Sequence, residues 1–481
     1  MIHARTVMAV TPALSLVAFA GSASAQWLSY TNMTTTKLTL STVSANDNQE
    51  KDIAKADFDK DGWDDLVVVR KEPFSNPGPR QDLLLMNEQG TLVDRTAQYA
   101  PGFLVNFTDA RDVLCRDFTG DGWIDIVICT TFDNPPRFYV NQGNNGSGQW
   151  LGLADESARI GPLSPSPFRM CGVNAGDIDN DGDLDMYWAN YNGGDDMLLV
   201  NDGAGNFTDQ TASRVGNYAN VAFGTGVEMG DFDQDGDVDI LKISTLFSAP
   251  PFSGGCYILW NDGTGKFNSM PFQQLTPTTS AYMFAAADFS GDGVTDFYIV
   301  QDPQDRVLVS TIVGPHNLSW IDKQVSGSRT DGFGGNVRVA DLDRDGDLDF
   351  GIAPIDVDIK NCGAGAQFAL LQNDGTGKLT DVMPANMNIN VDCHDFEFID
   401  INRDGCLDIF MGMCTGWRVF IADNCSCYAD CDFSGSLDVF DFLCFQDQFN
   451  ISQPYSDCDG SGGLDFFDFI CFVDKFNAGC P

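Results

Sequence analysis

Residues 177–185 read DIDNDGDLD, a stretch in which every second residue is an Asp. Variants of this pattern, D-x-D-x-D-G-x-x-D, begin at seven places: Asp57, Asp117, Asp177, Asp231, Asp288, Asp341 and Asp400. Successive copies start between 53 and 60 residues apart. An interval this regular is the signature of a repeat architecture, so the chain is expected to consist of seven similar units.

Apolar residues frame every copy of the acidic stretch. Four residues before the first Asp stand Ile53, Val113, Val173, Val227, Phe284, Val337 and Phe396, and nine residues after it stand Leu66, Ile126, Met186, Ile240, Phe297, Phe350 and Ile409. Their neighbours are rich in β-branched and aromatic residues. This composition predicts a strand, the acidic loop and a second strand.

A second turn signal follows in several units. It is Asn-Asp-Gly at Asn201, Asn261 and Asn373, and a looser form at Asn87 and Asn141. Asp-Gly between apolar runs favours a hairpin, because these residues tolerate positive φ. Each unit is therefore expected to hold four short strands, although the fifth shows no clear second turn between Gln301 and Asp322.

Four-stranded units repeated seven times predict an all-β fold, a seven-bladed β-propeller over residues 26–424. This span holds 399 residues, or 57 for each unit. The seventh unit, from His394 to about Asp423, has room for only three strands. Residues 27–43, which alternate in polarity around Leu38 and Leu40, are expected to add the missing outer strand and close the ring.

The acidic loops predict calcium sites. Ca²⁺ takes six to eight oxygen ligands, and alternate residues of a tight loop can direct their carboxylates at one centre. Four loops carry Asp at positions 1, 3, 5 and 9: Asp57, Asp59, Asp61 and Asp65; Asp177, Asp179, Asp181 and Asp185; Asp231, Asp233, Asp235 and Asp239; Asp341, Asp343, Asp345 and Asp349. A solvated acidic turn is the alternative, but four like charges in nine residues repel one another without a cation.

Three loops replace the Asp at position 3 by Thr, Ser or Asn. Their expected ligands are Asp117, Thr119, Asp121 and Asp125; Asp288, Ser290, Asp292 and Asp296; Asp400, Asn402, Asp404 and Asp408. Each set has one charge fewer, so weaker binding is expected. Mg²⁺ is disfavoured because it keeps several waters, and Zn²⁺ because no His or Cys clusters at these loops apart from Cys406.

The units resemble FG-GAP (VCBS-type) repeats, as in the seven-bladed propeller of integrin α chains and in some lectins. The Phe-Gly pair is present at Phe223-Gly224 and Phe333-Gly334 and absent from the other units, so the resemblance lies mainly in the acidic loop. It covers about residues 50–424. The resemblance implies calcium-stabilised blades and extracellular adhesion or ligand binding on one face of the disc.

Residues 425–481 differ in composition and hold a duplication, residues 429–450 and 456–477. Each copy begins with an EF-hand-like loop, whose expected ligands are Asp430, Asp432, Ser434, Asp438 and Asp441, then Asp457, Asp459, Ser461, Asp465 and Asp468. One apolar helical stretch follows each loop. The arrangement resembles a dockerin, a small α-helical module folded by Ca²⁺, and implies a cohesin-like partner. Up to nine Ca²⁺ are therefore expected, with disulfides among the module's Cys residues.

Composition limits the classes of partner. The net charge of −42 disfavours nucleic acid and anionic lipid. Residues 1–25 are typical of a signal peptide ending at Ala23-Ser24-Ala25, and no other apolar run is long enough for a membrane span. With 15 Cys in the remainder, we expect a secreted or surface-attached protein with disulfides, and at least one Cys that is free or bonded to another group.

The favoured function is an exported, non-catalytic adhesion or ligand-binding protein. Its propeller face binds a protein or a glycan, and the C-terminal module attaches it to a surface or scaffold. The alternatives are a polysaccharide lyase or hydrolase and a structural surface-layer component. No catalytic residue is predicted, because after residue 25 the only His are His316 and His394, and no G-x-S-x-G or H-E-x-x-H motif is present.

Overall fold

The computed structural model describes most of the chain. The described residues are 29–41, 50–72, 78–132, 134–161, 163, 169–191, 193–276, 280–301, 304–325, 335–353, 368–384, 387, 389, 393–423, 429, 431, 437, 439–450, 456, 458, 464 and 466–478. The predicted signal peptide lies outside them. So do eight predicted ligands of the C-terminal module: Asp430, Asp432, Ser434, Asp438, Asp457, Asp459, Ser461 and Asp465.

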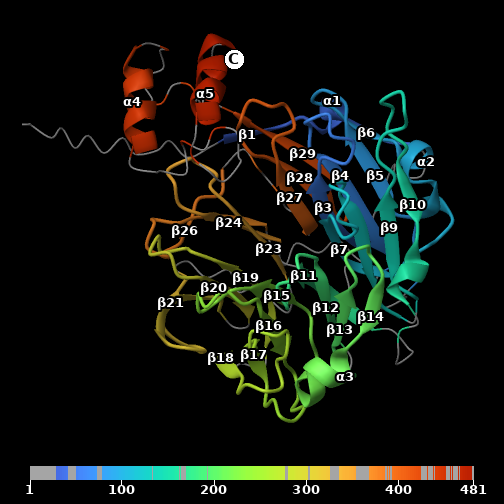
Figure 1. Ribbon diagram of the computed structural model, residues 1–481. Coiled ribbons are helices and arrows are strands. Elements are labelled where there is room, and N and C mark those ends of the chain that lie inside the picture. Colours follow the sequence, from blue (N-terminus) through green and yellow to red (C-terminus); the bar gives the residue numbers. More distant parts are fainter. Residues whose placement is uncertain are drawn as a thin grey trace, which may run out of the picture.

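The chain folds into a seven-bladed β-propeller, as the repeats predict. Each blade contains four antiparallel strands, the first of which lies near the centre of the ring (Figure 1). The first three blades contain β3 (Glu50–Ala56), β4 (Asp65–Lys71), β5 (Leu83–Asn87) and β6 (Leu92–Asp94); β7 (Ala110–Arg116), β8 (Asp125–Thr130), β9 (Arg137–Asn141) and β10 (Leu153–Asp155); β11 (Met170–Gly176), β12 (Asp185–Asn190), β13 (Met197–Asn201) and β14 (Phe207–Asp209).

The next three blades follow the same order. They contain β15 (Val227–Gly230), β16 (Asp239–Ser244), β17 (Gly255–Leu259) and β18 (Gln273–Thr276); β19 (Ala281–Ala287), β20 (Asp296–Gln301), β21 (Arg306–Gly314) and β22 (Asn317–Gln324); β23 (Asn336–Ala340), β24 (Asp349–Ala353), β25 (Ala369–Gln372) and β26 (Thr380–Asp381). The fifth blade does have its outer hairpin, since β21 and β22 pair over their whole length.

The seventh blade closes the ring with strands from both ends of the propeller. It contains β27 (Cys393–Ile399), β28 (Asp408–Met413), β29 (Gly416–Asp423) and, as its outer strand, β1 (Ser29–Asn32). The predicted closure is confirmed, because Ser29 pairs with Asp423 and Asn32 with Phe420. The alternating stretch around Leu38 forms a different element: β2 (Leu38–Thr39) runs parallel to β6 in the first blade.

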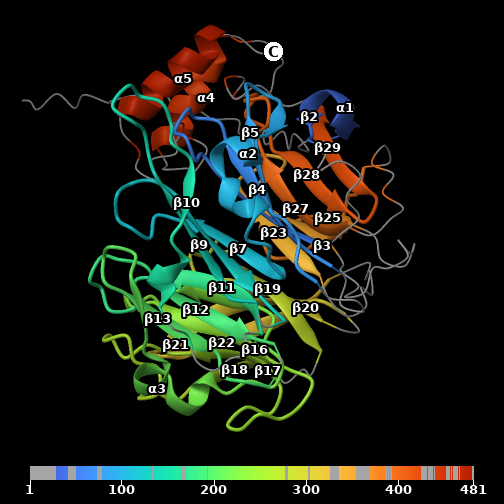
Figure 2. The same ribbon diagram turned by 90° about the vertical axis from the view of Figure 1, so that its right-hand side faces the viewer.

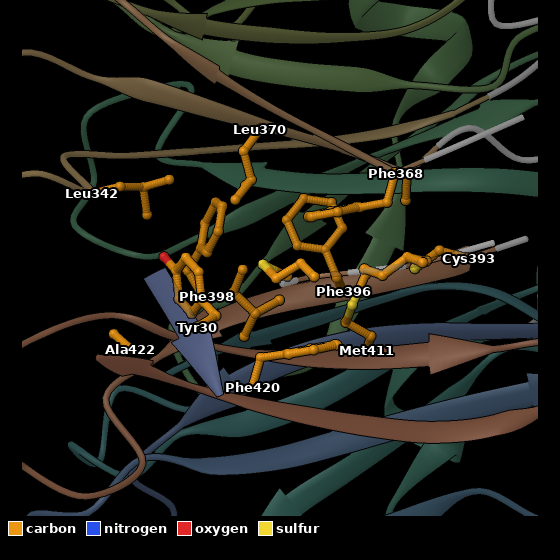
Figure 3. Close-up of a cluster of buried hydrophobic side chains, with 14 of the residues drawn as sticks. Tyr30, Leu342, Phe368, Leu370, Cys393, Phe396, Phe398, Met411, Phe420 and Ala422 are labelled. Carbon is orange, nitrogen blue, oxygen red and sulfur yellow. The ribbon is translucent and has the colours of Figure 1, made fainter. Parts of the chain in front are cut away.

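Hydrophobic clusters lie between neighbouring blades. The cluster between blades six and seven brings Phe368 and Leu370 against Phe396 and Phe398, and Tyr30 of β1 packs into the same cluster (Figure 3). Equivalent clusters fill the other six boundaries. Burial of apolar area therefore drives the closure of the ring as well as the folding of each blade.

Short helices connect some blades, and two longer helices form the C-terminal module. The short ones are α1 (Thr34–Lys37), α2 (Thr96–Tyr99), α3 (Thr211–Arg214), η1 (Pro101–Leu104), η2 (Ser157–Ile160) and η3 (Gly216–Ala219). The module contains α4 (Val439–Asn450) and α5 (Phe466–Ala478), which lie side by side outside the ring (Figure 2). Among the described residues, no helix combines the length and apolar character that a membrane crossing needs.

Disulfides and aromatic packing join the parts of the C-terminal module. Cys431 bonds to Cys444 and Cys458 to Cys471, each across 13 residues. Phe445 of α4 stacks on Phe472 of α5 at 4.1 Å between ring centroids, and both rings are buried. A core this small needs covalent links, so the pairing agrees with the expectation from the sequence.

Candidate metal centres

The acidic loops, numbered one to seven in chain order, all join the first and second strands of a blade. Each bends sharply at position 4 and at the Gly of position 6, where φ is positive. Position 4 is a non-glycine residue in five loops: Lys60, Asn180, Gln234, Arg344 and Arg403, with φ between 58° and 63°. The bend turns backbone amides inward, and the Gly182 N–H donates to Asp177 Oδ2 at 2.9 Å. The same bond recurs in every loop.

Carboxylates converge in the four loops that carry Asp at position 3. Oxygen atoms of three residues lie within 4.8 Å of one another in each: Asp57, Asp59 and Asp61; Asp177, Asp179 and Asp185; Asp231, Asp233 and Asp239; Asp341, Asp343 and Asp349. These clusters can hold metal ions. In loops two, five and seven no such trio of acidic, His or Cys residues forms within the described part of the chain, which matches their Thr, Ser and Asn at position 3.

Several of these carboxylate oxygens are buried and accept no hydrogen bond from the described residues. They include Oδ1 of Asp179, Asp233, Asp341 and Asp343, and Oδ1 of Asp400 in loop seven is in the same state. Burial with like charges nearby raises the pKa of Asp341 to about 6. An ionised, buried and unpaired oxygen is unfavourable, and a hard cation at the loop would supply its missing partner. The donor set therefore fits a divalent cation that prefers oxygen.

The Asp at position 9 has a second role that the sequence pattern does not indicate. In the third loop, Asp185 Oδ2 accepts the Ile178 N–H at 3.3 Å and Asp185 Oδ1 accepts the Asn201 N–H at 2.8 Å. All seven equivalents, Asp65, Asp125, Asp185, Asp239, Asp296, Asp349 and Asp408, are buried. Burial raises the pKa of Asp65, Asp239 and Asp349 to about 8. Position 9 therefore joins the loop to the third strand of its own blade.

The Asn of the second turn bridges two blades. Asn201 Nδ2 donates to the Phe118 carbonyl of the preceding blade at 2.9 Å. Asn141, Asn261 and Asn373 make the same bond to Phe58, Ile178 and Phe289, and Asn87 makes it across the ring closure to Ile401. We interpreted these Asn residues only as turn formers. Their constant distance of 83 or 84 residues from the acceptor in four of the five cases was the signal for this role.

The loops also touch one another around the ring. The Lys60 ammonium lies over the Trp123 ring at 4.4 Å, and the Arg403 guanidinium lies over Trp63 at 4.6 Å. Asn180 donates to Asp237 Oδ1 at 3.0 Å. Position 4 of one loop thus contacts the next loop, and the two Trp rings pack between blades.

A second polar cluster, which the sequence analysis missed, lies on the innermost strands. Arg338 of β23 donates to Asp395 of β27 at 2.9 Å and lies 3.5 Å from Glu397. On other inner strands, burial raises the pKa of Asp112 to about 6 and of Glu228 to about 7. The side chains come from the inner strands of blades two, four, six and seven and share no local motif, so the sequence pattern did not predict the cluster.

Comparison with known proteins places the repeats in a family. A model described as FG-GAP-like repeat matches residues 117–188 and 177–241. The chain contains FG-GAP-like repeats. Their matched segments include acidic loops two, three and four.

Two curated relatives carry the name cartilage acidic protein 1. The protein from Xenopus tropicalis is 25% identical over 312 residues, and the one from Mus musculus is 25% identical over 323 residues. In both cases the match takes in 62% of this chain and 47% of the relative. The chain thus spans about half the length of the curated relatives it matches.

Two solved structures show a likeness to the chain. One is an Agrocybe aegerita lectin that recognises non-reducing terminal N-acetylglucosamine, with a TM-score of 0.45, 18% identity, and coverage of 76% of this chain and 86% of the lectin. The other is the V. cholerae biofilm matrix protein Bap1, with a TM-score of 0.46, 12% identity, and coverage of 83% and 92%.

Proposed function

We propose that this chain is an exported, calcium-stabilised propeller that binds a protein or glycan ligand and performs no catalysis. The observation that carries the proposal is the repeated acidic loop, with its buried and unpaired carboxylate oxygens. Ca²⁺ would be held by the Asp, Thr, Ser and Asn side chains at positions 1, 3 and 5 and by Asp at position 9. It would supply positive charge and fix the bend of each loop.

The arrangement of the loops explains how calcium would serve binding. Loop residues contact the next blade, and Asp at position 9 links each loop to the blade's third strand. Cations at the loops would therefore hold neighbouring blades in one orientation. A rigid ring keeps the loops at the opposite ends of the strands in fixed places, and such loops on a rigid scaffold are where ligand-binding residues concentrate.

The C-terminal module is proposed to attach the propeller to a partner. Equivalent apolar side chains on its two helices are exposed: Val439, Phe440 and Leu443 on α4, and Phe466, Phe467 and Ile470 on α5. The position-12 residues Asp441 and Asp468 are buried in the first turns of these helices. An exposed apolar surface on a small module favours a protein partner, here of the cohesin type or a cell-surface component.

The enzyme alternative has little support in the described residues. His394 is buried, and His316 lies at an acidic loop. Many buried carboxylates lie in these loops or on the inner strands, and others have structural partners, such as Asp82 with Thr108 and Asp196 with Lys242. The relatives of 25% identity are named after cartilage, which favours an extracellular location for the propeller.

One experiment tests the proposal. The purified protein is applied to a glycan array and to immobilised candidate proteins, once with millimolar CaCl₂ and once with EGTA. We expect binding that EGTA abolishes, together with a lower melting temperature in EGTA. Cleavage of a polysaccharide would support the enzyme alternative, and self-assembly without binding would support the structural one. An identical melting temperature in both buffers would contradict the calcium role.

A further inference from the structure

Loop four differs from the other loops because a histidine reaches it from the next blade. In blade five, β21 and β22 have nine and eight residues, whereas the corresponding strands elsewhere in blades one to four and six have two to five. Ser310 occupies the place that Asn holds in other blades, since its N–H donates to Asp296 Oδ1 at 2.7 Å. The hairpin continues beyond Ser310 and turns at Pro315 and His316.

The turn places the imidazole against two loop carboxylates. His316 Nδ1 lies 3.3 Å from Asp233 Oδ2 and 3.7 Å from Asp235 Oδ2, and the His316 backbone N–H donates to Asp233 Oδ2 at 2.5 Å. The three side chains form one group with ligand atoms within 4.8 Å of one another. Asp233 is also a member of the carboxylate trio of loop four.

Two atoms of this group have no partner within the described part of the chain. They are His316 Nδ1 and Asp233 Oδ1, both buried. The Asp233 side chain has no exposed surface, and that of His316 is 22% exposed. A buried imidazole nitrogen that makes no hydrogen bond and lies 3.3 Å from a carboxylate oxygen points to a ligand that the two side chains share.

The geometry points to a zinc site at the boundary of blades four and five, formed by His316, Asp233 and Asp235. Ca²⁺ takes oxygen ligands, whereas Zn²⁺ combines an imidazole nitrogen with carboxylate oxygens. The other six loops present no His side chain, because His394 lies on β27 at the opposite end from loop seven. Loop four thus offers zinc a set of ligands that its neighbours lack, at two residues, Asp233 and Asp235, that the proposed function otherwise assigns to calcium.

This site would replace an interaction that the boundary lacks. In five other blades an Asn side chain bridges the third strand to the loop of the preceding blade, but Ser310 Oγ is buried without a hydrogen-bond partner in the described residues. A metal shared by loop four and the blade-five turn would join the same two blades. The zinc site does not depend on calcium at the other loops, so each is tested separately.

The test is a titration of the full chain with ZnCl₂ by calorimetry, in buffer saturated with CaCl₂ and again in calcium-free buffer. We expect one zinc ion per chain in both. His316→Asn removes the imidazole but keeps the backbone N–H, and Asn tolerates the φ of 54° at this position. Since loss of residues that merely orient zinc ligands costs about tenfold or more in affinity, loss of a ligand should cost at least that.

A matched control separates the zinc site from the calcium loops. Asp181→Asn alters position 5 of loop three, the equivalent of Asp235, where no imidazole is present. It is expected to lower calcium binding and leave zinc binding within twofold of the parent. Equal zinc affinity in the parent and His316→Asn, or an anomalous zinc signal in crystals at any loop other than loop four, would overturn the assignment. Failure of calcium binding with zinc binding intact would contradict only the proposed function.

Discussion

The two ends of each acidic loop handle negative charge differently. At position 9, Asp65 is buried and both of its oxygens accept backbone N–H groups, from Phe58 and Asn87. At positions 1 and 3, the carboxylates of Asp57 and Asp59 lie close together, repel each other and are half-buried. Backbone amides satisfy both oxygens of Asp65 and both oxygens of Asp57, but only the second end gathers like charges that a bound cation would offset. The comparison separates position 9, which also joins the loop to the blade, from positions 1 and 3, whose proposed role is to bind metal.

Removal of divalent cations tests positions 1 and 3 of the loops and should lower the stability of the protein more than any single substitution. Ligand bound only by the folded state stabilises it by about 2.7 kcal/mol per site at a hundredfold excess over Kd. With several loops occupied, the sum exceeds the effect of any single substitution. We expect EGTA to lower the melting temperature and added Ca²⁺ to restore it, measured by calorimetry. Restoration by Mg²⁺ alone would contradict the assignment of calcium.

The same chelated protein should show an unusual dependence on pH. Burial raises the pKa of Asp65, Asp239 and Asp349 from 3.8 to about 8, so without metal the folded state binds protons more tightly than the unfolded state. Their contribution to stability is present below pH 4 and is lost as the pH rises towards 8. We expect the melting temperature in EGTA to fall between pH 5 and 8, and to fall less in Ca²⁺. Parallel profiles in the two buffers would argue against metal at these loops.

Substitution of a position-9 residue tests the end of the loop at which a buried carboxylate accepts two backbone N–H groups. Asp65→Ala leaves the amides of Phe58 and Asn87 buried without acceptors, and each such group costs about 1–3 kcal/mol. We expect a loss of about 3 kcal/mol or more in urea unfolding, even in EGTA. The adjacent Asp64→Ala is the control, because its ion pair with Lys55 is exposed and is expected to cost less than about 1 kcal/mol. Similar losses for the two variants would remove the distinction.

The bridging Asn should have a smaller effect that is also independent of metal. Asn201→Ala removes bonds to the Phe118 and Leu184 carbonyls and leaves two loop amides without an acceptor. A loss of about 2 kcal/mol is expected by urea unfolding. Hydrogen exchange should locate the loosening at the boundary of blades two and three. Uniform loosening around the ring would indicate a different role.

The smallest expected effect is a change in the calcium affinity of the loops that carry Thr, Ser or Asn at position 3. Thr119→Asp restores a fourth carboxylate to loop two, so it should raise the calcium affinity of that loop by a few-fold, because added ligand charge tightens calcium loops. Calcium titration by calorimetry measures the change. Thr119→Asn supplies an oxygen without charge and is the control. A higher calcium affinity for Thr119→Asn than for Thr119→Asp would show that the number of charged ligands does not limit the calcium affinity of this loop.

The sequence predicted the parts of the fold that repeat locally. The acidic loop, its flanking strands and the blade number follow from a pattern within each unit, and the closing strand follows from the shortage of strands in the last one. The residues that act between units were not predicted. His316 reaches loop four only because a hairpin is extended, and Arg338 meets Asp395 only across two inner strands. Such contacts depend on the register between blades, which no local spacing encodes.

The pairing of β1 with β29 has a consequence for the order in which parts of the chain can fold during synthesis. Ser29 and Asp423 lie in one sheet, although 393 residues separate them along the chain. During synthesis, the segment that emerges first must wait for one of the last to appear before its backbone groups are paired. Until then the nascent ring stays open between β1 and β29. The unpaired edges of these two strands are where a chaperone or a protease would bind the incompletely folded chain.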